Sequence, residues 1–381
     1  MKRVMLLFLS LILAAGSFAC IPAAAAGDDV CLNAKAAYSC DWRSGRVIYE
    51  SNAETRLPIA SMCKIMTLVL CFDALDEGRY VLSDEVCVSE NASGMGGSQV
   101  FLETGGEYPA GELVKSICIA SANDSCVAMA EFLYGSETSF VEKMNERARE
   151  LGMDNTRFVN CTGLPQEGQF SCAKDVSKML SELLKHDEYY SYCKIWMDEI
   201  THSGGRKTEM ANTNKLIRSY IGCDAGKTGF TSQAGFCLAA SALRGDMRVI
   251  AVVIGSRSGK ERFDGCKTLF DYAFANYECR AVLKAGILKD ACCPIRAGKE
   301  KTVTVSCENS LYSFGKRGLK NEIDFQLHFN NVVAPVEKGE CVGEVSVYEN
   351  GVEIGRSRLL SVDDVARINY SDSIKNAAEN W

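Results

Sequence analysis

The sequence predicts an α+β protein in which helices cover an antiparallel sheet and a small all-β domain follows. Residues 36–50 have the pattern of a β-hairpin, and residues 236–243 and 248–254 that of two adjoining strands. The stretch between them, residues 61–185, is mostly helical in its apolar spacing. Beyond about residue 290 the pattern changes to strand-like alternation. We therefore expect strands far apart in the chain to form one sheet beneath helices, with a separate β module after it.

The N-terminus has the pattern of a secretory signal peptide. Lys2 and Arg3 precede the run 4–13, which contains a single polar residue, and small residues then lead to Ala26. The run is too short and wrongly flanked to span a membrane. We expect residues 1–26 to be removed and the protein to be exported.

Removing 26 residues from 381 leaves 355, more than one hydrophobic core usually organises, so two domains are expected. We place the first domain at 27–288, an all-β domain at 289–364 and a tail at 365–381. Without Lys2 and Arg3 the balance is 40 basic against 49 acidic residues, a net charge of −9. Since no basic cluster stands out, nucleic-acid binding is not expected.

Local signals justify the elements of the first domain. A glycine turn joins the two halves of the early hairpin, and the turn 244–246 joins the two late strands. The sequence pattern is helical at 112–119, before Ser121, and again at 125–133. We therefore expect Ser121 and Asn123 to lie in a bend between two helices, facing a cleft. Helical text after Lys260 closes the domain.

The second domain shows alternation at 302–305, 323–329 and 342–347, and Glu349-Asn350-Gly351-Val352 predicts a hairpin turn. In the tail, a short helix would gather a narrow apolar face without any cationic bias. We expect such a weakly amphipathic helix to give loose peripheral membrane contact at most. Its apolar positions are Ile374, Ala377, Ala378 and Trp381.

Nineteen cysteines in an exported chain would ordinarily indicate a disulfide framework. Here they are scattered singly, without any Cys-x-x-Cys, and many fall within apolar runs where cysteine acts as a small hydrophobe. We expect mostly free thiols, with a disulfide-rich fold as the alternative. With only three histidines to join them, no metal site is expected.

The sequence Ser61-Met62-Cys63-Lys64 opens an apolar run with the length of a buried helix. Residues three apart share a helix face, so the Lys64 amine can reach the Ser61 hydroxyl, a nucleophile beside a base. In the first helical turn, free N–H groups favour negative charge developing at Ser61. Alone, this spacing also fits an N-cap serine followed by a solvated lysine.

Two further motifs remove that ambiguity. Ser121-Ala122-Asn123 and then Lys227-Thr228-Gly229 follow in the order and rough spacing of the active-site serine penicillin-binding proteins and β-lactamases. The wider text resembles the low-molecular-mass D-alanyl-D-alanine carboxypeptidases, peptidase family S11. The matching stretches are 56–61, 119–125, 151–153 and 225–231. The resemblance is good over about 32–285 and weaker to about 362.

This resemblance implies a β-lactamase/transpeptidase-like first domain and a role for each motif residue. Ser61 would attack a carbonyl carbon while Lys64, kept neutral by burial and by the Lys227 charge, takes its proton. Ser121 would relay a proton to the leaving amine, and Asn123 would bind the substrate amide. The remaining assignments are an oxyanion hole from the backbone N–H groups of Ser61 and Phe230, a substrate carboxylate held by Lys227 and Thr228, and close approach of a substrate strand at Gly229.

Selectivity for a free chain end needs a further group that recognises a carboxylate. The resemblance places an arginine after the last core strand, and Arg262 is the best-aligned candidate, with Arg257 as the fallback. Two departures from the family pattern stand out. Residues 160–164 read Asn-Cys-Thr-Gly-Leu where relatives usually have Asn-Pro-His-Gly-Leu, so that loop is assigned no catalytic residue, and Cys63 occupies a position where relatives often carry threonine.

The sequence thus predicts a cofactor-free enzyme, at the cell wall or on the outer face of the cytoplasmic membrane, that removes the terminal D-alanine from peptidoglycan stem pentapeptides. β-Lactam antibiotics would be its covalent inhibitors. The alternatives are a β-lactamase and a non-catalytic protein that binds the cell wall or senses β-lactams. A Ser-His-Asp hydrolase is disfavoured, since no Gly-x-Ser-x-Gly occurs.

Overall fold

The structure, a computed structural model, describes residues 30–319 and 321–370. The predicted signal peptide and the tail positions 371–381 lie outside the described residues. Within the described ranges, none of the helices is long and apolar enough to cross a membrane.

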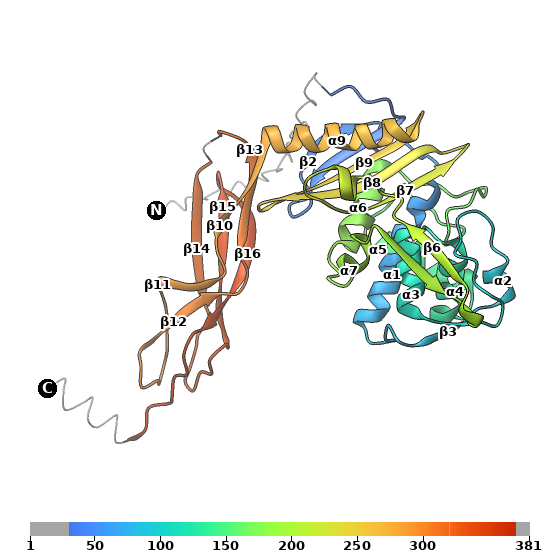
Figure 1. The fold of residues 1–381 in the computed structure, drawn as a ribbon. Helices are drawn as coiled ribbons and strands as arrows, with labels where there is room; N and C mark the ends of the chain where they lie inside the picture. The colour runs from blue at the N-terminus through green and yellow to red at the C-terminus, as the bar shows by residue number, and fades with distance from the viewer. Residues whose placement is uncertain (1–29, 320, 371–381) are drawn as a thin grey trace, which may run out of the picture.

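A five-stranded antiparallel sheet forms the centre of the first domain, in the order β2-β1-β9-β8-β7 (Figure 1). Its strands come from the predicted hairpin and the late strands, so the expected long-range pairing is confirmed. Their bounds are β1 Ala36–Asp41, β2 Val47–Ser51, β7 Cys223–Thr231, β8 Gly235–Arg244 and β9 Met247–Ser256. The central strand β9 is buried along nearly its whole length, which explains why its sequence is almost continuously apolar.

Helices cover both faces of this sheet. On one face lies α9 (Gly259–Asn276), which begins at a capping box of Ser258 and Glu261 and buries Leu269 and Phe270. On the other face α6 contacts β9 and β1, and α1 packs against α6. The helices on that side are α1 Lys64–Asp76, α2 Glu90–Ser93, α3 Ala110–Ile119, α4 Asn123–Tyr134, α5 Glu137–Glu150, α6 Ala173–Leu183 and α7 Tyr189–Cys193. Leu216 of the short helix α8 (Leu216–Ser219) packs instead with Leu269 and Phe270 on the α9 side.

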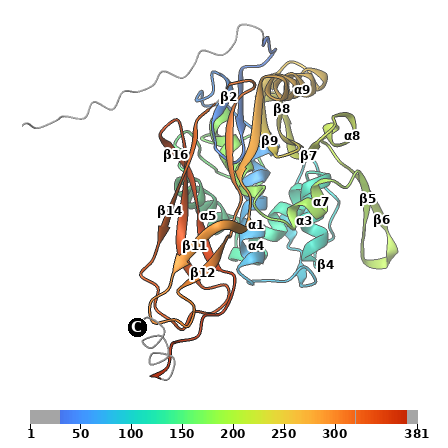
Figure 2. The same ribbon diagram turned by 90° about the vertical axis from the view of Figure 1, so that its left-hand side faces the viewer.

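Short elements complete the domain. A 3₁₀ turn, η1 (Ala60–Cys63), precedes α1, and another, η2 (Ser203–Gly205), joins the hairpin β5–β6, which projects from the helical side in Figure 2. The remaining strands are β3 Glu85–Cys87, β4 Glu107–Pro109, β5 Met197–Thr201 and β6 Lys207–Ala211.

The second domain is all-β, as expected. Strand β10 (Tyr277–Leu283) follows α9 directly and pairs with β13 (Leu311–Lys316), and a five-stranded sheet has the order β11-β12-β16-β15-β14. The predicted turn is confirmed: Asn350 and Gly351 have φ of 50° and 79°, as a two-residue hairpin turn requires. The bounds are β11 Gly286–Pro294, β12 Thr302–Cys307, β14 Ile323–Phe329, β15 Cys341–Glu349 and β16 Val352–Ser361.

The eighteen cysteines of the described residues are all free thiols, and thirteen of them are buried. Cys63, Cys71, Cys118 and Cys126 pack in the largest apolar core, among leucine, valine and methionine side chains. Burial raises the pKa of the Cys126 thiol to about 12. These thiols therefore serve as small hydrophobic groups.

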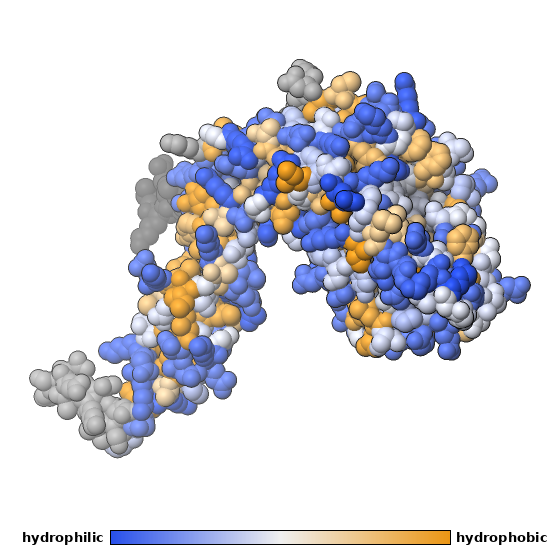
Figure 3. Space-filling view, in the orientation of Figure 1, coloured by the Kyte–Doolittle hydropathy of each residue, from blue (hydrophilic) through white to orange (hydrophobic). Residues whose placement is uncertain are grey.

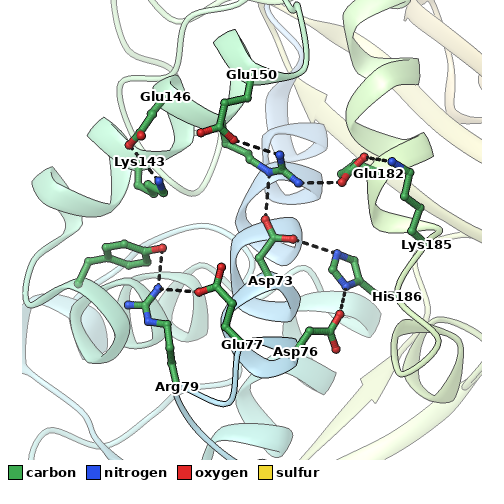
Figure 4. Close-up of polar contacts among 12 residues, drawn as sticks. Asp73, Asp76, Glu77, Arg79, Lys143, Glu146, Glu150, Glu182, Lys185 and His186 are labelled. Atoms are coloured by element: carbon green, nitrogen blue, oxygen red, sulfur yellow. Dashed lines mark hydrogen bonds and ion pairs between the residues drawn. The ribbon is translucent and has the colours of Figure 1, made fainter.

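An ion cluster fastens the C-terminal end of α1 to α5 and α6 (Figure 4). Arg147 donates to Asp73 at 3.0 Å and to Glu182 at 2.7 Å, while His186 contacts Asp73 at 3.3 Å and Asp76 at 2.6 Å. Burial tends to lower the pKa of His186, but its hydrogen bonds to Asp73 and Asp76 outweigh burial and raise that pKa. In its protonated form, His186 thus joins two carboxylates of α1.

We expect this histidine to make stability fall as pH rises. Since the pKa of His186 is higher in the folded chain, its contribution is complete below the unfolded value of about 6.5 and is lost as pH rises through the folded pKa. His186→Gln should lower the free energy of unfolding by roughly 1–2 kcal/mol near pH 6, the order of a charged hydrogen bond, and by less at higher pH. Urea unfolding at several pH values measures this, and an equal loss at every pH would contradict it.

Candidate active site

Ser61 lies in a 3₁₀ turn rather than in the first α-helical turn that the sequence predicted. The turn η1 runs directly into α1 at Lys64, and Ala60, the first residue of η1, has a φ of +48°, unusual for a residue with a Cβ. In a 3₁₀ turn residues three apart are eclipsed, which brings Lys64 Nζ to 3.2 Å from Ser61 Oγ. The predicted contact of hydroxyl and amine is present.

The Lys64 amine is completely buried and has two further partners. It donates to Asn123 Oδ1 at 2.6 Å and to the Thr162 carbonyl at 2.5 Å. Both oxygens can only accept, whereas the Ser61 hydroxyl can also donate. A neutral amine that gives its two N–H groups to Asn123 and Thr162 therefore keeps its lone pair for the Ser61 proton. This arrangement suits a base.

Asn123 is held at both ends. Its Nδ2 donates to the Gly96 carbonyl at 2.6 Å, which fixes the amide so that Oδ1 faces Lys64, and its backbone N–H donates to the Ser98 carbonyl. The neighbouring Asp124 carboxylate is buried and accepts N–H bonds from the same loop, at Val100 and Leu102. The amide predicted to bind substrate also positions the lysine.

Ser121 sits between α3 and α4, as predicted, in a strained conformation. Its φ is +64°, and its side chain is buried with no hydrogen-bond partner for Oγ among the described residues. Such strain is commonly concentrated at functional sites, and an unpaired buried hydroxyl is rare. The hydroxyl is therefore available to a group that enters the site.

The backbone of loop 160–163 accepts hydrogen bonds from the Ser61 turn and α1, although the sequence assigned this loop no catalytic residue. Besides the Thr162 carbonyl bonded to Lys64, the loop accepts a bond from Thr67 Oγ1 at the Cys161 carbonyl, 2.6 Å, and from the Cys63 thiol at the Asn160 carbonyl, 3.3 Å. Three side chains of the Ser61 turn and α1 thus rest on three successive carbonyls.

Two glycines permit the close packing around Ser61. A Cβ on Gly163, whose φ is +82°, would lie 2.1 Å from the Ala60 carbonyl oxygen. A Cβ on Gly229 would lie 2.6 Å from the Ile59 carbonyl oxygen. The structure therefore gives Gly229 a role that the sequence did not predict: it allows β7 to lie against the Ser61 turn.

Lys227 is buried on β7, an edge strand of the sheet. Burial, and secondly the charge of Lys64, lower the pKa of Lys227 to about 7. Among the described residues its one hydrogen bond is long, 3.5 Å, to the Thr228 carbonyl, while Thr228 Oγ1 donates to Thr213 Oγ1 at 2.8 Å. A cation and a hydroxyl are thus close to the free edge of β7.

Arg262 reaches the Lys-Thr-Gly sequence from the first turn of α9. Its Nη1 donates to the Gly229 carbonyl at 3.0 Å, and its guanidinium lies over the rings of Phe236 and Phe263. Its Nε is buried without a partner in the described ranges. Phe230 follows Gly229 on β7 and is 55% exposed, stacked on Phe236 with ring centroids 4.3 Å apart.

The chain matches known protein families over both of its domains. A sequence profile described as D-alanyl-D-alanine carboxypeptidase matches residues 23–258. The chain belongs to the D-alanyl-D-alanine carboxypeptidase family. A second profile, the C-terminal domain of penicillin-binding protein 5, matches residues 277–367. The chain is 39% identical to the D-alanyl-D-alanine carboxypeptidase DacF of Bacillus subtilis over 353 residues, 91% of this chain and 90% of the relative.

Solved structures agree with this carboxypeptidase fold. Penicillin-binding protein 5 from Haemophilus influenzae superposes with a TM-score of 0.68 at 29% identity, over 88% of this chain and 98% of that protein. The ampicillin-bound penicillin-binding protein D2 from Listeria monocytogenes has a TM-score of 0.57 at 30% identity, over 64% and 98%. The predicted family and fold class are therefore confirmed.

Several groups of this carboxypeptidase site were not found from the sequence. They are the Thr162 carbonyl, Thr67, Gly163 and the buried Asp124. A backbone carbonyl leaves no trace in residue type, and Thr67 and Asp124 read as ordinary helix residues. Gly163 was the one available sequence signal, because the loop keeps the family's glycine although the two residues before it differ from the family pattern.

We expect Gly163→Ala to disrupt the nucleophile while Gly168→Ala does not. The two glycines have nearly equal φ, +82° and +85°, so the backbone strain is matched, but a Cβ at Gly168 meets only the Arg157 side chain at 3.6 Å. Displacing Ser61 by about 1 Å costs on the order of 100-fold in rate. The rate of covalent penicillin labelling measures the difference, and similar rates in the two variants would contradict the steric argument.

Proposed function

We propose that this protein removes the terminal D-alanine from peptidoglycan stem pentapeptides through an acyl-enzyme on Ser61. The observation that carries the proposal is the Ser61–Lys64 contact of 3.2 Å, in which the other two partners of the amine can only accept. Membership of the D-alanyl-D-alanine carboxypeptidase family supports the choice of substrate.

In the acylation step, Ser61 Oγ bonds to the carbonyl carbon of the penultimate D-alanine and its proton passes to Lys64 Nζ. The developing oxyanion would be held by the backbone N–H groups of Ser61 and Phe230. The C–N bond then breaks, and Ser121 relays the proton held by Lys64 to the departing amine, which leaves Lys64 neutral. The unpartnered hydroxyl of Ser121 supports this role. Water then hydrolyses the Ser61 ester, with Lys64 accepting a proton from the water and returning it to Ser61 Oγ.

Recognition of the substrate chain is assigned to β7 and its neighbours. The free edge of β7 can pair with an extended peptide, and the Asn123 amide lies beside Lys64 at the same site. Lys227, Thr228 and Arg262 would bind the terminal carboxylate. Lys227 is buried without a carboxylate partner in the described residues, which supports this assignment because an anionic ligand would supply the negative charge that the lysine lacks.

The same site would take β-lactams as covalent inhibitors, because the lactam ring stands in for the D-Ala-D-Ala bond and cannot diffuse away after opening. An ampicillin-bound structure among the relatives supports this. We also propose export, to the cell wall or to the outer face of the membrane, on the pattern of residues 1–26, with weak peripheral membrane contact through the tail.

The deciding experiment compares turnover of diacetyl-Lys-D-Ala-D-Ala with hydrolysis of nitrocefin. We expect release of D-alanine from the peptide and slow or no nitrocefin turnover. Fast nitrocefin hydrolysis without peptide turnover would establish a β-lactamase instead. Binding of penicillin with neither activity would establish a sensing or binding protein.

We expect penicillin to attach to Ser61 alone. Intact-protein mass should rise by one drug per chain, and Ser61→Ala should abolish the adduct. Lys64→Ala should slow acylation by several orders of magnitude, because losing the base of a nucleophile–base unit costs nearly as much as losing the nucleophile. An adduct that persists in Ser61→Ala would remove Ser61 from the mechanism.

Acylation should also depend on pH near neutrality. Because the pKa of Lys227 is lowered to about 7, Lys227 loses its proton as pH rises through that value, and with it the charge that would bind the drug carboxylate. The rate of penicillin acylation should therefore fall as pH rises, with an inflection near this pKa that Lys227→Gln removes. Stopped-flow labelling across the range tests this, and a flat profile in the unaltered protein would refute it.

Arg262→Ala should lower kcat/KM for the D-Ala-D-Ala peptide by about 10- to 100-fold, the order of a charged hydrogen bond to carboxylate. Penicillin acylation should fall less, since other contacts hold the drug. Arg257→Ala is the matched control, because Arg257 carries the same charge on the exposed turn before α9. Unchanged peptide turnover in Arg262→Ala, or a larger loss in Arg257→Ala, would transfer the role to Arg257.

A further inference from the structure

Strand β14 of the second domain ends its sheet on the side away from the catalytic domain (Figure 1). Apolar and polar residues alternate along it, and its two central apolar residues are exposed, Phe325 to 48% and Leu327 to 41%, while Ile323 and Phe329 are half-buried. Apolar surface is visible along this side of the domain in Figure 3. The apolar set is Ile323, Phe325, Leu327 and Phe329, and the polar set is Asp324, Gln326 and His328.

The hydrogen bonds at both ends of β14 show which backbone groups are free. The Glu322 carbonyl accepts from Asn350 N–H at 2.9 Å, and Asn330 N–H donates to the Val342 carbonyl at 2.9 Å. Even-numbered residues therefore face β15, and the register between them is unbroken. Since successive residues of an antiparallel strand face opposite sides, the four odd-numbered residues direct their N–H and C=O groups to the open edge.

The opposite edge of the same sheet is protected, and β14 is not. Edge strand β11 carries Lys289, Asp290 and Pro294, and its pairing with β12 is interrupted between Ile287 and Cys292. Charges, proline and irregular register are the usual devices that prevent edge-to-edge association. The sequence of β14, Ile-Asp-Phe-Gln-Leu-His-Phe, has no lysine, arginine or proline.

The sequence of β14 is also complementary to itself. In an antiparallel pair of two copies centred on Gln326, all seven residues find partners: Phe325 lies opposite Leu327, Ile323 opposite Phe329, and Asp324 opposite His328. The apolar pairs fall at the odd-numbered positions, whose backbone groups are the free ones. The acidic and imidazole side chains meet on the other face, twice by symmetry.

We propose that two copies of this protein associate through β14 in this antiparallel register. The two five-stranded sheets then become one continuous sheet with a two-fold axis at Gln326. A contact confined to one strand is smaller than the roughly 1,200–2,000 Å² of a standard interface, so we expect a weak dimer with a Kd of about 1–100 µM. On a wall or membrane, the paired catalytic domains would engage substrate bivalently.

Sedimentation velocity of the chain without residues 1–26, from about 1 µM to about 500 µM, tests the proposal, since this range spans the expected Kd. We expect the sedimentation coefficient to rise from monomer toward dimer. Phe325→Lys/Leu327→Lys should remain monomeric. Ile287→Lys is the matched control, because Ile287 is 61% exposed on the protected edge, and this variant should dimerise normally. Penicillin labelling should be equal in all three, which verifies folding.

A charge exchange tests the register. Asp324→Lys alone should weaken the dimer, because it places lysine opposite His328, and adding His328→Asp should restore it. Gln326→Cys should give a disulfide-linked dimer joined at that position, since the axis brings the two copies of residue 326 together. The parent protein and Phe325→Cys measure the background from other thiols.

A monomer throughout the concentration range would overturn the proposal. A dimer that survives Phe325→Lys/Leu327→Lys would overturn the assignment to β14. Failure of the double charge exchange to restore association, together with equal crosslinking at positions 325 and 326, would overturn the register.

Discussion

Two buried lysines that share one core, without a carboxylate beside either in the described residues, are the constraint on which the rest of this site depends. An ammonium removed from water without a counterion is costly, so the fold must satisfy each amine with neutral acceptors or leave it uncharged. Lys64 receives an amide oxygen and a backbone carbonyl, whereas Lys227 receives little. Lys64 can therefore act as a proton acceptor, while Lys227 in the same site lacks an anionic partner within the described part of the chain.

The surrounding structure holds that arrangement in place. Asn123 is clamped by the Gly96 carbonyl, the loop before α4 is clamped by Asp124, and loop 160–163 is pressed against the Ser61 turn. The positive φ values at Ala60 and Ser121 are tolerated because these contacts over-determine the backbone. At the other end of α1, the ion cluster of Figure 4 anchors the same helix, so both ends of the element that carries Lys64 are fixed.

The sequence was informative wherever the signal was local. Period-two alternation located the strands, and the three-residue spacing of Ser61 and Lys64 was enough to predict their contact. The 3₁₀ form of that turn was not predictable, because it depends on the Ala60 backbone and on packing against Gly163 and Gly229. The bond from Lys64 to Thr162 spans 98 residues, and no periodicity encodes such a contact. Roles inferred from resemblance also missed that Asn123 positions the base.

The thirteen buried thiols affect how the protein folds more than how stable the folded protein is. Once the core closes, these thirteen residues are buried, which shields their sulfur atoms from oxidants in solution. On the proposed export route, the thiols are exposed together before the chain folds, and any two can form a disulfide before they are buried. The native protein therefore forms only if folding is faster than thiol oxidation, which rapid folding or oxygen-poor surroundings favour. Yield after export, more than thermal stability, should respond to the redox potential outside the cell.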